Sequence, residues 1–82
     1  MICGIYAIRD CKSTFMPATV DVNDASAIRN FEFACQQQDS LMRTHRKDFS
    51  LWKLGTFDNE TALIDVLVPP IQIADGSSLE VM

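Results

Sequence analysis

The chain has 82 residues, of which 48% are hydrophobic and 22% are charged, and its 11 acidic and 7 basic residues give a net charge of −4. This length accommodates one hydrophobic core, so we expect a single domain over residues 1–82. The composition excludes a disordered tail, and the acidic balance excludes binding to membranes or nucleic acids through bulk charge alone. Any such binding requires a local patch.

The first segment, residues 2–9, is apolar on both alternate sets of positions and predicts a strand buried on both faces. It is too short to span a bilayer and follows no basic flank, so we expect no membrane segment or export signal. Residues 15–20 are expected to form an edge strand or extended segment, because Pro17 cannot donate a ladder hydrogen bond.

A helix of about twenty residues is predicted from Asp24, after several possible N-capping side chains. Its core-facing stripe steps by three or four positions through Ile28, Phe31, Cys35, Gln38 and Met42. The basic residues Arg43, Arg46 and Lys47 would then occupy its last turn, where the helix dipole favours cations.

Residues 48–57 and 62–68 are rich in β-forming side chains and flank four turn-forming residues, which predicts a hairpin. In the second arm the uniformly apolar set (Ala62, Ile64, Val66, Val68) is expected to face the core. Gly55 predicts a bulge or a close backbone approach. Pro69-Pro70 is expected to end the strand, leaving residues 69–82 as an extended tail with a short strand over residues 71–74.

These elements predict an α+β fold: a small three- to four-stranded, mainly antiparallel sheet with one long helix packed on one face, in the order β-(β)-α-β-β. The sheet has few residues to bury, so the monomer should be only marginally stable.

No constellation of residues indicates an enzyme. The three cysteines (Cys3, Cys11, Cys35) form no C-x-x-C pair and His45 is the only histidine, so we expect free thiols in a reducing compartment, no metal site and no cofactor. Cys35 and His45 would lie about 15 Å apart on one helix, too far for a nucleophile and its base. Paired carboxylates and a glycine-rich phosphate loop are also missing from the sequence.

Two surface features remain as candidates. The basic run Arg43, Arg46 and Lys47, followed by Trp52 and Lys53, could contact nucleic acid, although cations at a helix end are commonly only solvated. Phe33, Leu63 and Leu67 are apolar residues on faces assigned to solvent, which predicts an oligomer interface and favours a two-fold homodimer.

Several motifs occur in order between Ile5 and Asp58. They are Ile8-Arg9-Asp10-x-Lys12 with Phe15 and Pro17, Asn23-Asp24, Ala27-Ile28-Arg29-x-Phe31, and Asp48-Phe49-x-Leu51-x-Lys53-Leu54-Gly55-x-Phe57-Asp58. This set resembles the small nonstructural proteins of gokushoviruses, single-stranded DNA phages of the Microviridae.

The resemblance implies a noncatalytic protein of the infected bacterial cytoplasm, absent from the capsid and linked to single-stranded DNA genome synthesis or packaging. Its expected partners are single-stranded DNA or the phage and host proteins of replication or packaging. Ala18-Thr19 stands where the family has bulkier aromatic residues, which argues against stacking on DNA at those positions. The alternative is a protein–protein adaptor or scaffold without nucleic-acid affinity, which the acidic balance favours.

Overall fold

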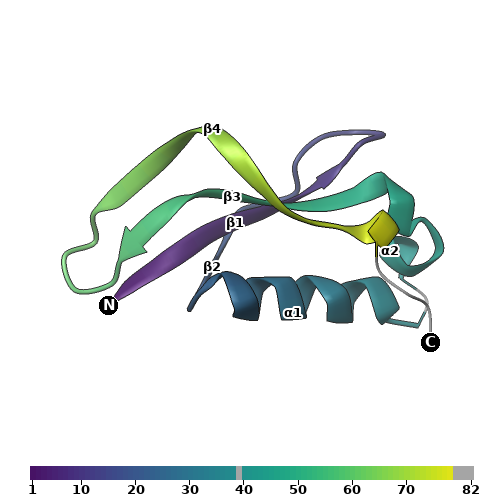
Figure 1. Cartoon of the computed structure of the whole chain (residues 1–82), viewed down its shortest axis with the longest axis horizontal. Helices are drawn as coiled ribbons and strands as arrows, with labels where there is room; N and C mark the ends of the chain where they lie inside the picture. The colour runs from purple at the N-terminus through teal and green to yellow at the C-terminus, as the bar shows by residue number, and fades with distance from the viewer. Residues whose placement is uncertain (39, 79–82) are drawn as a thin grey trace.

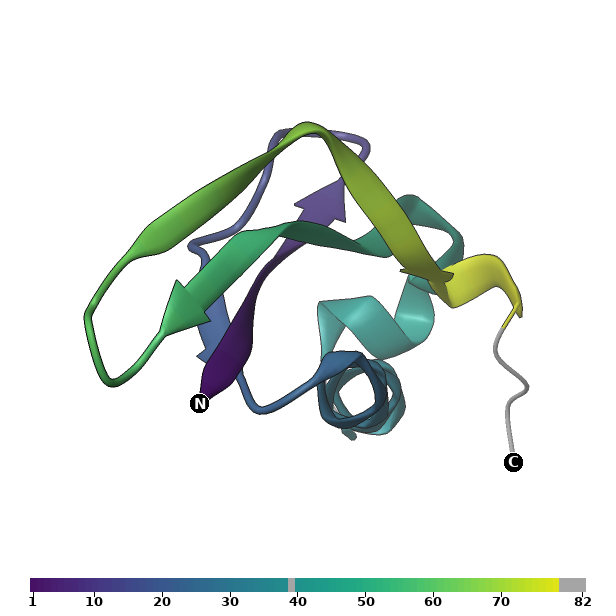
Figure 2. The same cartoon turned by 60° about the vertical axis from the view of Figure 1, so that its left-hand side comes forward.

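The fold is a four-stranded antiparallel sheet with one face covered by a helix, seen in a computed structural model that describes residues 1–38 and 40–78 (Figures 1 and 2). The strand order is β2-β1-β3-β4. The strands are β1 (Ile2–Asp10), β2 (Thr19–Asp21), β3 (Phe49–Asp58) and β4 (Ile64–Asp75), and α1 (Asp24–Gln36) follows β2. The predicted α+β class and the element order are therefore confirmed.

Strand β1 lies in the middle of the sheet, between β2 and β3. Its buried residues belong to both alternate sets, with Cys3 and Ala7 on one face and Tyr6 on the other. This confirms the prediction of a strand buried on both faces. Gly4 is needed beside Tyr6, because a Cβ at that position would overlap the phenol ring.

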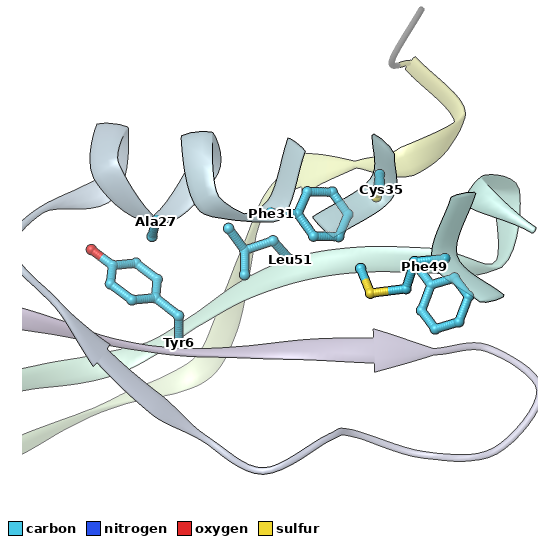
Figure 3. Close-up of a cluster of buried hydrophobic side chains, with 7 residues drawn as sticks. Tyr6, Ala27, Phe31, Cys35, Phe49 and Leu51 are labelled. Atoms are coloured by element: carbon cyan, nitrogen blue, oxygen red, sulfur yellow. The ribbon is translucent and has the colours of Figure 1, made fainter. Parts of the chain in front are cut away.

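The core lies between the sheet and α1 (Figure 3). Ala27, Phe31 and Cys35 point from one stripe of α1 toward Tyr6 and Leu51. Met42 and Phe49 complete the cluster of buried side chains. The helix begins at its Asn23 N-cap, whose side-chain oxygen accepts a hydrogen bond from the Ser26 N–H at 2.8 Å.

The single helix of about twenty residues is wrong. It divides into α1, a short helix α2 (Leu41–Thr44) and a 3₁₀ turn (Arg46–Asp48). Gln37 leaves the helical conformation, and the Ser40 side chain caps α2 by accepting from the Met42 N–H. An unbroken helix would run about 36 Å over residues 24–47. The break instead lets Met42 fold back into the core, where only 8% of it is exposed.

The predicted hairpin is confirmed, since β3 pairs with β4. Gly55 lies beside an irregularity in both of its ladders, and a Cβ there would overlap the carbonyl oxygen of Asp65. Both parts of the prediction for Gly55 therefore hold. The turn between the strands contains Ala62 at a positive φ of 64°.

Pro69 and Pro70 do not end the second arm, which is a correction to the sequence-based prediction. Strand β4 continues to Asp75, so the predicted short strand over residues 71–74 is its second half. The register passes from Val66 opposite Gly55 to Ile71 opposite Lys53. The residues between them, including both prolines, have no paired partner in β3, so their missing N–H groups disturb no ladder. Residues 79–82 of the predicted tail lie outside the described residues.

The expected core face of the second arm is also wrong. Ile64, Val66 and Val68 expose 60%, 71% and 88% of their surface, and Ala62 is an exposed turn residue. The hairpin extends beyond α1 at the end of the sheet that carries the N-terminus (Figure 1). The register also places Ile64 and Val66 on the sheet face away from α1, so a longer helix would not cover them.

The segment expected to be extended between residues 15 and 20 is only partly a strand. Phe15 forms an isolated antiparallel bridge with Arg9, and β2 begins at Thr19. A last 3₁₀ turn covers Gly76–Ser78. Within the described ranges, none of the helices has the length and apolar character needed to cross a membrane.

Candidate nucleic-acid interface

Trp52, Phe15 and Arg9 form a contiguous aromatic and basic surface, which we call the outer cluster. The Phe15 and Trp52 rings meet edge to face, with centroids 6.0 Å apart and planes at 79°. The Arg9 guanidinium carbon lies 6.0 Å from the centroid of Phe15. The Trp52 indole N–H donates to the Ser50 hydroxyl at 2.8 Å, which fixes the orientation of the ring.

Strand alternation and one returning loop bring the outer cluster together. Arg9 pairs with Ser50 and Ala7 pairs with Trp52 across β1 and β3, so these positions share the sheet face away from α1. The loop after β1 rises on that same side and turns back (Figure 1). The Met16 N–H then donates to the Ile8 carbonyl at 2.7 Å, which holds Phe15 against the strand.

Further cations lie at the same end of the molecule. The Cys11 N–H in the loop that carries Lys12 donates to the Asp48 carbonyl at 2.8 Å, which ties this loop to the 3₁₀ turn of Arg46 and Lys47. Arg43 lies in α2, and its side chain is exposed, as are those of Lys12 and Lys47. The opposite end of the sheet carries the hairpin turn (Figure 1), whose Asp58 and Glu60 both pair with the N-terminal amine. The charged residues that give the net charge of −4 are therefore unevenly distributed, with exposed cations at one end of the molecule and acidic side chains at the hairpin turn.

Lys53 does not join this surface. Its ammonium group lies 3.0 Å from the Asp24 carboxylate, which also accepts a hydrogen bond from the buried Tyr6 hydroxyl at 2.5 Å. That hydrogen bond, followed by Lys53, lowers the pKa of Asp24. Burial, followed by the bond to Asp24, raises the pKa of Tyr6. Lys53 thus joins the sheet to the first turn of α1, on the face opposite Trp52.

The residues predicted for an oligomer interface are separated. Phe33 is 65% exposed in the second half of α1, and α1 runs away from the β3–β4 turn (Figure 1). Leu63 is 68% exposed beside that turn, and Leu67 is half-buried in β4. The two leucines therefore belong to the hairpin and Phe33 to another surface.

Sequence reasoning missed Arg9, Lys12 and Phe15 as members of a site. Arg9 was visible as the only cation of an otherwise apolar strand, two positions beyond Ala7 on the same face. Phe15 gave no comparable signal, because the loop geometry alone brings it back to Arg9.

A pocket of ≈ 390 Å³ opens between α1 and the edge of β1 and β2. Apolar side chains form much of its lining, and two of its polar residues are joined by a hydrogen bond of 2.7 Å that the Asn30 amide donates to Asp21. Within residues 1–38 and 40–78, no group of three histidine, cysteine or acidic side chains lies close enough to hold a metal ion.

The model of the family described as phage ORF5 protein matches residues 3–79. The chain belongs to that family. It is therefore a phage protein, and the match includes β1 from Cys3 onward, the outer cluster, α1 and the whole hairpin. Searches of the curated proteins and of the solved structures give no match.

Proposed function

We propose that this phage protein is a noncatalytic accessory protein that binds single-stranded DNA in the cytoplasm of the infected bacterium, during genome synthesis or packaging. The observation that carries the proposal is the contact of Arg9, Phe15 and Trp52 at the end of the molecule that also holds Lys12, Arg43, Arg46 and Lys47. Proteins that bind single strands combine aromatic side chains that stack on bases with cations that follow the phosphates. The sequence resemblance to gokushovirus nonstructural proteins supports the same choice of ligand.

The outer cluster offers both kinds of contact within a short reach. The aromatic faces supply stacking that tolerates any base, and Arg9 supplies a planar cation. Lys12 of the loop and Arg46 and Lys47 of the 3₁₀ turn would extend the contact along the DNA backbone. Acidic residues at this end are partly engaged locally, since Asp10 accepts from the Lys12 N–H at 3.0 Å and Asp48 from the Cys11 thiol at 3.6 Å.

Trp52 allows a direct test, because it is the only tryptophan in the chain. A single-stranded oligonucleotide that stacks on the outer cluster should quench its fluorescence, with an affinity that falls as salt rises. Substitutions in the outer cluster, such as Trp52→Phe, would change or remove the tryptophan fluorescence. The affinity of each variant is therefore measured by the fluorescence anisotropy of a labelled oligonucleotide. Phe15→Ala should weaken binding roughly 5- to 150-fold, the effect of losing one stacking platform.

Phe33→Ala is the matched control, because it removes an exposed phenylalanine from a different surface. It should leave the affinity unchanged. Lys47→Gln should weaken binding to every sequence and reduce the salt slope by about one. Absence of binding at low salt and tens of micromolar protein would refute the proposal.

A protein–protein adaptor without nucleic-acid affinity is the second candidate. The specific observation that favours it is the row of exposed aliphatic side chains on the hairpin. Capture of the tagged protein from infected cells separates the two candidates. An adaptor retains its protein partners after nuclease treatment, whereas partners held through DNA are released.

A further inference from the structure

The free edge of β4 carries an unusual run of exposed aliphatic residues. Between residues 63 and 68, Leu63, Ile64, Val66 and Val68 are 60–88% exposed, and Asp65 is the only charged residue. Strand β4 is the last in the sheet order, so no described strand pairs with its outer edge. Monomeric proteins usually protect such edges with charges, prolines or short strands, because an open edge recruits another strand.

The backbone of this edge is available for pairing. The Asp58 N–H donates to the Leu63 carbonyl at 2.9 Å, so these two residues form a hydrogen-bonded pair. In an antiparallel ladder such pairs alternate with pairs that exchange no hydrogen bonds. Ile64 opposite Phe57 and Val66 opposite Gly55 therefore belong to the second kind. Their N–H and C=O groups point away from β3, toward the free edge.

Ile64 and Val66 lie on one face of this edge, and Leu63 lies on the other. Phe57 pairs with both Cys3 and Ile64, which places Ile64 and Val66 on the sheet face away from α1. That face is apolar at this end, and α1 does not extend over it. A strand that added to β4 would thus gain backbone hydrogen bonds and an apolar contact together.

We propose that a second copy of this chain pairs antiparallel with β4, across a two-fold axis at Val66. This register places Val66 opposite Val66 of the partner subunit and Ile64 opposite Val68 of the partner subunit. It also keeps Asp65 away from its own copy, whereas a two-fold axis at Asp65 would set two like charges directly opposite each other. Pro69 and Pro70 lack N–H groups, so they limit the pairing to the segment before them.

The apolar area fits a weak, reversible dimer. Burial of an aliphatic side chain removes on the order of 100 Å² from water. The exposed side chains of the paired segment, Ile64, Val66 and Val68 on each copy, would therefore supply at most roughly 600 Å² of apolar area in the dimer. This is below the apolar share of the smallest stable interfaces, which bury about 1,200 Å² in total, so the backbone hydrogen bonds of the paired edges contribute to the association as well. We expect a dissociation constant on the order of 1–100 μM.

Sedimentation across a concentration series tests the proposal. The wild-type protein should pass from monomer to dimer, and Val66→Lys should weaken the association at least tenfold while the monomer stays folded by circular dichroism. Val22→Lys is the matched control. Val22 lies between β2 and α1, is 54% exposed, and is far from β4 in the sheet order. It should associate like the wild type. A wild-type protein that remains monomeric to about 1 mM, or assembles beyond a dimer, would overturn the proposal.

Cross-linking tests the register without a destabilising charge. In a Cys11→Ser background, which removes the exposed native thiol, Val66→Cys should form a disulfide-linked dimer on mild oxidation. Residues opposite each other in a hydrogen-bonded pair have Cα atoms about 5.5 Å apart, within the range for a disulfide. Val68→Cys, although more exposed, should not cross-link because it meets Ile64 of the partner subunit. Equal cross-linking of the two variants would contradict the register. If Val66→Cys forms no disulfide-linked dimer, the proposed pairing is contradicted.

Discussion

Strand β3 passes through two environments, and their difference shows what makes a core in this small sheet. In its first half Phe49 and Leu51 are each 4% exposed beneath α1 and α2. In its second half it pairs with Ile64 and Val66, which are 60% and 71% exposed. Both halves of the hairpin are rich in β-forming apolar residues. Phe49 and Leu51 face the helix. Ile64 and Val66 lie on the opposite face of the sheet, so burial depends on the second layer and not on strand composition.

The largest difference between the two halves should appear on truncation of Phe31, which is 2% exposed at the centre of the core. Phe31→Ala should lower the free energy of unfolding by about 3–5 kcal/mol, because it removes a buried ring and leaves a cavity. For a domain of this size that is a large part of the total, roughly 4–12 kcal/mol. Urea denaturation followed by circular dichroism measures the loss, and a change below about 1 kcal/mol would mean that this core is not packed as described.

Gly55→Val should affect the exposed half more than the covered half. The added side chain would overlap the Asp65 carbonyl and force β4 away from β3, at a cost of about 2–3 kcal/mol. Hydrogen exchange should rise at residues 64–66 and much less in β1. Thr56→Val, one position further along β3, should leave exchange at residues 64–66 close to the wild type.

Asp24→Asn should weaken the covered half in a pH-dependent way. The carboxylate is 47% exposed, so loss of its bonds to Tyr6 and Lys53 should cost only about 1 kcal/mol at neutral pH. The pKa of Asp24 is lowered in the folded protein. Its contribution is therefore present above the unfolded pKa of about 3.9 and is lost as the pH falls through the lower folded value. Denaturation midpoints of the wild type and the variant should converge below about pH 4, and a constant gap would contradict this role.

The smallest effect is expected for Val68→Ala, because 88% of Val68 is exposed. Measured at a protein concentration where the monomer dominates, the free energy of unfolding should change by less than about 0.5 kcal/mol. A loss comparable with that of Phe31→Ala would show that another element covers the exposed half in solution.

Local patterns predicted the elements better than they predicted what covers them. The helix start at Asp24, the stripe through Phe31 and Cys35, and the role of Gly55 could be predicted because they depend on residue spacing and backbone chemistry. The break after Gln36 could not be predicted in the same way. It depends on Met42 turning back into a core that exists only in three dimensions. The apolar set on β4 predicted a shared face for Ile64 and Val66 correctly but not its burial, because periodicity does not tell which face of a sheet a helix covers.

The candidate site followed the same division. The run from Arg43 to Lys47 was evident from its charge, and Trp52 was evident as the only tryptophan. The separation of Trp52 from Lys53 follows from strand alternation, which sends neighbours to opposite faces. The contact between Arg9 and Phe15 depends on a loop whose path is fixed by long-range hydrogen bonds, such as that between Cys11 and Asp48. Sequence spacing carries no record of such contacts.

The elongated outline of the molecule, 40 Å along its longest axis and 22 Å along the next, has a consequence for avidity. The loop after β1 and helix α2 lie toward one end of this axis, and the hairpin turn lies at the other (Figure 1). If both proposals hold, two copies joined through β4 would hold their two outer clusters apart, so that one DNA strand could be bound at two distant points. The second contact would then form at a high effective concentration, so weak single contacts would together hold the DNA strand tightly. This tighter binding would depend on the protein concentration, because only the dimer makes both contacts.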